Sequence, residues 1–196
     1  MSFRNLKLQT LGIAAALALG SLAFTGCTTT TADSQASNSS ARQNIDSGVE
    51  TTLSRLYNTV PGSREMVDKA AGVLVFPSMV GGGFVIGAAY GRGALRVGGQ
   101  IDSYYSTTAG SIGFQAGGQS KAVIYVFNTQ ESLEKFRNSR GWTVGADATV
   151  TVATVGANAS VDNHTIQQPV VGYVLTNVGL EAGASVQGAK INRIEP

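Results

Sequence analysis

The sequence predicts an α+β fold: helices precede a strongly curved, barrel-like antiparallel β-sheet of about eight strands, and one further helix is inserted between strands. Apolar residues recur at helical spacing between residues 45 and 60, which predicts an N-terminal helix. From Gly72 onward the chain changes to short runs of alternating apolar and small residues, separated by many of its 25 glycines. Such runs predict strands joined by tight turns. A chain of 196 residues suffices for one sizeable core, and we expect a single folded domain over residues 42–196.

Residues 1–26 have the pattern of a lipoprotein signal peptide. Two basic residues precede an apolar run over residues 8–24, and the small residues Thr25 and Gly26 lead to Cys27. The run is short for a membrane span, which needs roughly 20 residues. The sequence FTGC resembles a bacterial lipobox, in which the cysteine is lipidated on its sulfur and becomes the first residue of the mature protein. We therefore expect palmitate or a similar acyl group on Cys27. The alternative is an ordinary exported protein in which this cysteine has no role.

The residues after Cys27 predict a location and a tether. Thr28 stands where an aspartate would favour retention in the inner membrane, so we expect an outer-membrane lipoprotein that faces the periplasm. Residues 27–41 are rich in Thr, Ser, Ala and Asn and contain almost no apolar bulk. Such a segment gains too little from burial to offset its ordering, and we expect a flexible tether with a reach of roughly 20 Å.

An apolar stripe predicts the first helix. Its members are three or four residues apart or adjacent: Ile45, Val49, Leu53, Leu56, Tyr57 and Val60. The polar face carries charges of both signs, whereas a helix that lies on lipid is expected to have a basic polar face. We therefore favour packing against the core over apposition to a membrane. Pro61 and Gly62 end the helix.

Two shorter helices follow. Ser63 is placed to cap a helix that runs to about residue 70. Asn128, with a glutamate three residues later, predicts a capped helix over residues 129–138. Leu133 and Phe136 are expected on the buried side of this inserted helix.

The glycines allow two interpretations. Gly83, Gly87 and Gly91 have the spacing by which membrane helices pack closely. The apolar stretch over residues 80–91 is too short to span a bilayer, and an even spacing also places all three glycines on one face of a strand. We favour the strand, in which glycine permits bends, bulges and close backbone approach, and keep a glycine-zipper lipoprotein as the alternative. Trp142 is expected in the core.

Composition and motifs exclude several classes. The 14 basic residues exceed the 12 acidic ones only through Arg4 and Lys7 of the predicted signal peptide, so the mature domain is formally neutral. Bulk charge therefore does not predict nucleic-acid binding, and an anionic ligand needs a local cluster of cations. One Cys and one His exclude an internal disulfide and the usual structural zinc sites. The chain has no GxSxG, Walker or HExxH motif, and His164 is expected in a turn with no nucleophile beside it. We expect no enzyme activity, cofactor or metal.

Three blocks of the sequence, in order, resemble the SYLF domain family. They are AAGVLVFPSMVGGGFVIGAAYGRGALRV at residues 70–97, AGSIGFQAGGQSKAVIYVFNTQESLEKFRNSRGWTVGADATVTVATVGANA at 109–159, and GLEAGASVQGAKI at 179–191. The resemblance implies a lipid-binding domain. Eukaryotic members bind phosphoinositides and other anionic phospholipids, a yeast branch is called actin-binding, and bacterial members are typically lipoproteins or exported proteins. We expect this domain to engage anionic phospholipid or a membrane surface. The alternative is a structural envelope lipoprotein that binds a protein partner.

A bound anionic headgroup would require converging cations, because arginine and lysine donate charge-assisted hydrogen bonds to phosphate. The candidates are Arg92, Arg96, Lys121, Lys135, Arg137 and Arg140. Arg92 and Arg96 are four residues apart and share a face if their segment is extended. The alternative for each candidate is a solvated surface charge, and Lys135 and Arg137 are favourable at the end of a helix in any case.

Overall fold

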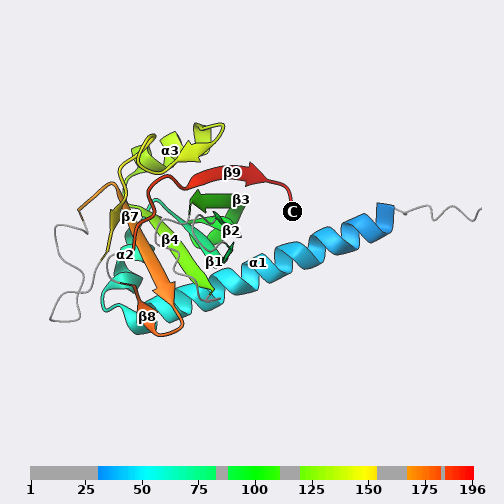
Figure 1. Cartoon of the computed structure of the whole chain (residues 1–196), viewed down its shortest axis with the longest axis horizontal. Coiled ribbons are helices and arrows are strands. Elements are labelled where there is room, and N and C mark those ends of the chain that lie inside the picture. Colours follow the sequence, from blue (N-terminus) through cyan, green and yellow to red (C-terminus); the bar gives the residue numbers. More distant parts are fainter. Residues whose placement is uncertain (1–30, 83–87, 111–119, 154–166, 182–183) are drawn as a thin grey trace, which may run out of the picture.

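The computed structural model describes residues 31–82, 88–110, 120–153, 167–181 and 184–196, and these ranges contain three helices and nine strands (Figure 1). The helices are α1 (Thr31–Thr59), α2 (Ser63–Lys69) and α3 (Gln130–Asn138). The strands are β1 (Gly72–Gly82), β2 (Ala88–Val97), β3 (Gln100–Gly110), β4 (Lys121–Phe127), β5 (Trp142–Thr143), β6 (Thr151–Val152), β7 (Val170–Thr176), β8 (Gly179–Leu180) and β9 (Lys190–Ile194). The predicted α+β class with a strongly curved sheet is confirmed.

The strands form one sheet in the order β5-β9-β3-β2-β1-β4-β7-β6, and β8 pairs with β7 outside this path. The named strands pair antiparallel except β6 and β7, which are parallel, so the sheet is mixed where the sequence predicts a wholly antiparallel one. A parallel pair needs a crossover of a dozen or more residues, and the chain between β6 and β7 is long enough to supply it.

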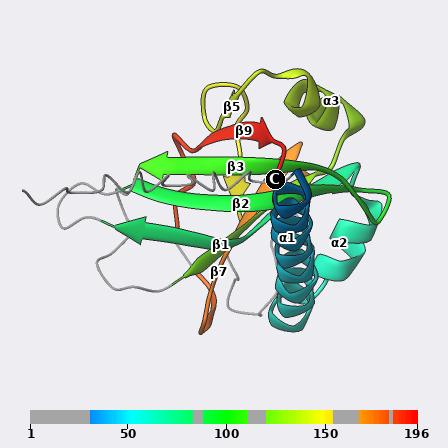
Figure 2. The same cartoon turned by 90° about the vertical axis from the view of Figure 1, so that its right-hand side faces the viewer.

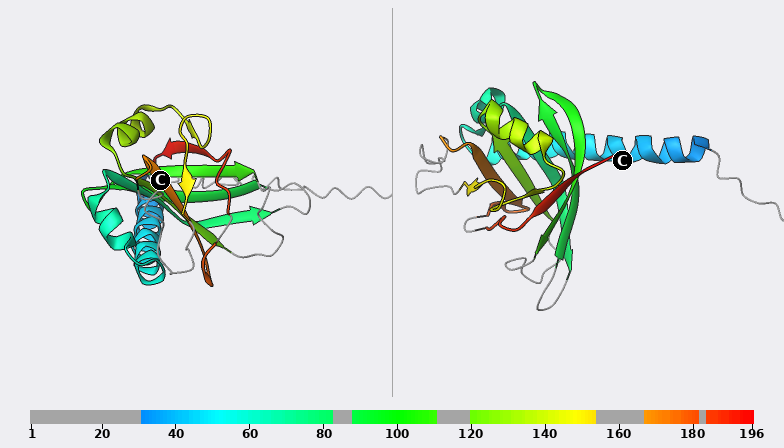
Figure 3. Two further views of the ribbon diagram at one scale, coloured as in Figure 1. Left: turned by 90° about the vertical axis from the view of Figure 1, so that its left-hand side faces the viewer. Right: turned by 90° about the horizontal axis from the view of Figure 1, so that it is seen from above.

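The sheet curls into a half-barrel (Figure 3). Trp142 of β5 and Tyr125 of β4 are five steps apart in the strand order, yet their ring centroids lie 6.0 Å apart. In a flat sheet five steps of about 4.8 Å would separate them by roughly 24 Å. The contact therefore requires the two ends of the sheet to curve toward each other.

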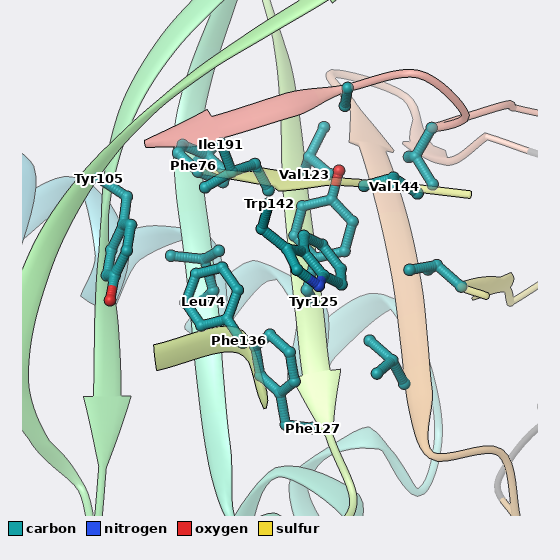
Figure 4. Close-up of a cluster of buried hydrophobic side chains, with 14 of the residues drawn as sticks. Leu74, Phe76, Tyr105, Val123, Tyr125, Phe127, Phe136, Trp142, Val144 and Ile191 are labelled. Carbon is teal, nitrogen blue, oxygen red and sulfur yellow. The ribbon is translucent and has the colours of Figure 1, made fainter. Parts of the chain in front are cut away.

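Aromatic residues fill the inner side of this curve (Figure 4). Trp142 is 2% exposed, as the sequence predicts for a core residue. Helix α3 closes the inner side with Leu133 and Phe136, and the Phe136 ring meets the Trp142 ring edge to face at a centroid distance of 5.3 Å. Edge-to-face contact adds to the free energy that burial of these rings supplies.

Helix α1 covers the outer side of the sheet. Five members of its predicted stripe are buried there over β1 and β2, in an outer cluster that also includes side chains of β4 and β7: Ile45, Val49, Leu53, Leu56 and Val60. The prediction that this helix packs on the core is therefore confirmed. Helix α2 adds Met66 to the same outer cluster.

The helix boundaries differ from the predictions in three places. Helix α1 begins at Thr31, so residues 31–41, which the sequence predicts as part of the tether, are helical. Propagation from the packed turns costs little in a segment that contains several alanines, whereas an isolated tether would have to nucleate its own helix. Gly62, with a φ of 79°, is the N-cap of α2. The Ser63 hydroxyl instead donates to the backbone carbonyls of Leu56 and Val60, in the last turn of α1 and just after it. Thr129 caps α3 by accepting from a backbone N–H, while Asn128 donates to the carbonyl of Gln168.

Strand β1 contains a bulge, and strand β2 contains one of the three evenly spaced glycines. Strand β1 continues through Pro77, where a shift in register with both neighbouring strands marks a bulge. A proline fits a bulge because no ladder hydrogen bond is required of its nitrogen. Gly91 lies in β2, which confirms the strand interpretation at that position, whereas Gly83 and Gly87 lie outside the described residues.

Candidate functional site

Arg92 and Arg96 share one face of β2, as their spacing predicts. Ala94 lies between them on this face and is buried in the outer cluster, where α1 crosses the sheet (Figure 2). The two arginines therefore lie on either side of the α1 crossing.

Arg96 is held by protein groups. Its guanidinium lies 3.2 Å from the Glu50 carboxylate and donates to the Gly99 carbonyl at 2.6 Å, and its side chain is only 19% exposed. It lines a cleft of about 280 Å³ together with Tyr57 and Asp68. Burial raises the pKa of the Tyr57 phenol, and the nearby Arg96 opposes this rise. With both terminal nitrogens of its guanidinium engaged and a carboxylate beside it, Arg96 is poorly placed to attract a second anion.

Arg92 has a different environment. It is exposed, and its Nε donates to the Tyr90 hydroxyl at 3.2 Å. Both residues line a second cleft, of about 320 Å³, that also includes Ala41 of α1 and the C-terminal residues Glu195 and Pro196. Among the described residues no carboxylate forms an ion pair with Arg92. Arg92 is therefore the predicted cation with the most freedom to bind an anionic group beside α1.

Lys121 lies at the beginning of β4, in the middle of the sheet. Its Nζ is 2.7 Å from the Glu181 carboxylate, and both side chains are largely buried. Removal of one partner would leave the other charge uncompensated in a poorly solvated position. The Lys121–Glu181 pair is therefore best explained as an ion pair that stabilises the fold.

The three predicted cations at the end of α3 lie across the sheet from α1 (Figure 1). Lys135 pairs with Glu131 one helical turn away, and Arg137 reaches Asp102 of β3 at 2.9 Å. Arg140 is exposed just beyond the helix. The six predicted cations thus occupy separate regions and do not converge on one ligand in the described parts of the chain. Their role in binding stays a prediction.

Sequence reasoning missed Tyr90 and Lys190. In the sheet, Tyr90 of β2 is opposite Thr108 of β3, which is in turn opposite Lys190 of β9. Alternation along the strand could have placed Tyr90 beside Arg92. Lys190 could not have been placed from the sequence, because β9 joins β3 through a long-range pairing.

The described residues contain no cluster of three or more side chains suited to a metal ion. No helix in these ranges is long and apolar enough to cross a membrane. His164 and Cys27 lie outside the described part of the chain.

A family model matches part of the chain. No curated protein matches the chain significantly. Residues 108–195 match the family model Ysc84, described as "Las17-binding protein actin regulator". The matched segment runs from the end of β3 to β9 and includes α3. It overlaps two of the three blocks that resemble SYLF domains. Residues 108–195 are therefore similar to the Ysc84 (SYLF) family, in agreement with the resemblance of the sequence blocks.

Proposed function

We propose that this chain is an exported bacterial lipoprotein whose SYLF-type domain binds anionic phospholipid at a membrane surface and performs no chemistry. Three findings support the proposal: the lipobox-like sequence before Cys27, the family match over residues 108–195, and a cation beside α1 that has no acidic partner among the described residues.

The observation that carries the proposal is the environment of Arg92. The mature domain is formally neutral, so attraction to an anionic surface depends on local charge. Arg92 is exposed in a cleft, and its hydrogen bond to the neutral Tyr90 hydroxyl orients the guanidinium without neutralising it. A planar guanidinium in this state is suited to paired hydrogen bonds with phosphate oxygens.

The anchor and the domain would act together. Acyl chains on Cys27 would hold the domain close to the bilayer, so that a weak local site meets lipid at high effective concentration. A single acyl chain gives only marginal membrane binding, and a second contact from the domain would make attachment stable.

Vesicle co-sedimentation tests the lipid-binding proposal. The variant that lacks residues 1–27 retains every described residue and removes the anchor. It is expected to sediment with vesicles that contain phosphatidylglycerol or cardiolipin, and much less with vesicles of phosphatidylcholine alone. Equal recovery in the supernatant with both kinds of vesicle at moderate salt would refute the proposal.

The anchor is tested separately in cells. Cys27→Ser is expected to abolish labelling by a palmitate analogue and to move the protein from the membrane fraction to the soluble fraction. Unchanged labelling would exclude Cys27 as the lipidated residue.

A further inference from the structure

The outward side chains of four neighbouring strands form a continuous surface beyond α1. Residues directly opposite each other in antiparallel strands share a face of the sheet. Tyr90 of β2 is opposite Val80 of β1 on one side and Thr108 of β3 on the other, and Thr108 is opposite Lys190 of β9. Arg92 lies two residues from Tyr90 on the same face. We call these five residues the outer sheet patch.

Helix α1 borders this patch at the cleft that Ala41 shares with Tyr90 and Arg92, but it leaves the side chains of the patch exposed. It crosses the sheet near Ala94 of β2 and Tyr104 of β3, which are opposite each other. Ala94 is buried in the outer cluster, and Tyr104 lies under the Arg42 guanidinium and donates to Asp46 of α1. Tyr90 is four residues from Ala94, which corresponds to roughly 13 Å along the strand. Figure 2 shows β1, β2 and β3 continuing past the helix.

The outer sheet patch combines exposed apolar side chains with basic ones. Val80 is 68% exposed and Tyr90 47% exposed, and they are two of the three large apolar side chains that are exposed in the described residues. Lys190 is opposite Thr108 at the β9 side of the patch, and Arg92 lies two residues along β2 from Tyr90. Neither cation forms an ion pair with a described carboxylate. The five residues of the patch include no acid, and Glu195, which lines the cleft of Tyr90 and Arg92, lies 3.8 Å from the Arg42 guanidinium.

This combination fits the interfacial region of a bilayer. Tyrosine places its ring at the level of the headgroups with the hydroxyl toward water, and valine adds apolar area. Arginine and lysine extend along apolar surface and keep their charges among the phosphates. Three steps between strands give the patch a width of roughly 14 Å, a broad and shallow surface rather than an enclosed pocket.

We propose that the outer sheet patch is the surface that docks on a bilayer of anionic phospholipid. The proposal rests on the proposed lipid-binding function and specifies where and how the domain binds. Arg92 and Lys190 contact phosphates of the leaflet that the domain meets, while Val80 and Tyr90 enter the headgroup region.

A tryptophan reporter tests the location. Tyr90→Trp introduces an indole at the centre of the patch, and the native Trp142 is buried and serves as an internal reference. On phosphatidylglycerol vesicles with brominated acyl chains, the emission of the new indole is expected to shift to shorter wavelength and to be quenched.

Val178→Trp is the matched control. Val178 is 94% exposed and lies in the β7–β8 turn. The adjoining Gly179 approaches Thr59 at the C-terminal end of α1, whereas Arg92 and Tyr90 share their cleft with Ala41. Eighteen helical residues separate these two positions, or about 27 Å. Quenching of the Val178→Trp protein, or the absence of quenching in the Tyr90→Trp protein while it sediments with vesicles, would overturn the location.

Charge removal tests the contacts. An exposed cation near an anionic membrane improves binding roughly fivefold, so the double variant Arg92→Ala/Lys190→Ala is expected to bind these vesicles about 30-fold more weakly. Lys69→Ala/Arg193→Ala removes the same charges from exposed positions outside the patch and is expected to bind within about twofold of the wild-type protein. Equal losses in the two double variants would show that general charge attracts the protein and would overturn the patch.

Two further outcomes separate this proposal from the proposed function. If the wild-type protein fails to sediment with anionic vesicles, lipid binding itself is refuted. If it sediments but soluble glycerol phosphate releases it, the site holds a single headgroup and the docking proposal fails while lipid binding stands. Docking on a bilayer predicts that glycerol phosphate leaves sedimentation unchanged.

Discussion

Gly93→Ala should destabilise the domain strongly, because β2 passes unusually close to β1 at this glycine. A Cβ atom on Gly93 would overlap the Val75 carbonyl oxygen of β1 and lie 2.7 Å from Cδ1 of Phe76. Ordinary contacts begin at 3.4 Å, so even the Phe76 ring would have to move by about 0.7 Å. The nearest obstacle is backbone next to the Pro77 bulge, which cannot move aside by a rotamer change.

The expected cost lies at the upper end of the range for an overpacked core, about 3 kcal/mol. For a chain of this length such a loss lowers the melting temperature by roughly 6–12 °C. Urea denaturation followed by the fluorescence of the buried Trp142 measures it. Gly110→Ala is the control, since no atom of the described residues other than its chain neighbours lies within 4 Å of its Cβ position, and the free energy of unfolding should change by less than about 0.5 kcal/mol. A Gly93→Ala protein as stable as the control would refute the inference that close strand approach requires this glycine.

Three other changes test local parts of the structure. Burial raises the pKa of Tyr173 to about 12 and also raises that of Tyr125, so the unfolded state alone releases these protons just above pH 10. The stability that the neutral phenols contribute is fully present below pH 10. Between pH 10 and about 12 the free energy of unfolding should fall by about 1.4 kcal/mol per pH unit for each tyrosine, and a Tyr173→Phe protein with an unchanged slope in urea titrations would contradict the assignment. Thr129→Ala removes the side-chain cap of α3 and should cost about 1 kcal/mol in the same denaturation assay, whereas Thr129→Ser should retain most of that stability. Arg96→Ala should leave vesicle binding within about twofold of wild type, because Glu50 already compensates this cation, and a loss as large as that of the patch variant would place Arg96 in the binding surface.

The sequence predicts the elements whose signal is local. The stripe of α1 and the buried side of α3 follow from spacing alone, and Trp142 is in the core as its size and apolar character suggest. The start of α1 could not be predicted, because the stability of its first turns comes from the packed turns that follow. The cap of α3 is Thr129 rather than the predicted Asn128, for a similar reason. Asn128 donates a hydrogen bond to the carbonyl of the distant Gln168, and the local sequence does not predict this contact.

In the candidate site too, local spacing predicts some features, whereas others depend on long-range contacts. The shared face of Arg92 and Arg96 follows from the period of a strand, but which arginine is available depends on Glu50 of α1, more than 40 residues away in the chain. Lys190 becomes relevant only because β9 pairs with β3 across about 80 residues. Single cations could be named from the sequence, whereas their neighbours depend on long-range pairing that composition and spacing do not encode.

The docked position of α1 decides which part of the outer face can meet a membrane. If the apolar stripe of α1 entered lipid, the bilayer would bury the apolar surface of the helix but not that of the sheet. Val75, Ile124 and Tyr173 of the sheet would then face water. Exposure of such side chains costs about 1.5–3 kcal/mol each, and the whole outer cluster would cost on the order of 10 kcal/mol. That cost is comparable with the total stability of a typical domain. Binding through the outer sheet patch incurs no such cost, because Tyr90 and Arg92 are already exposed while α1 stays packed.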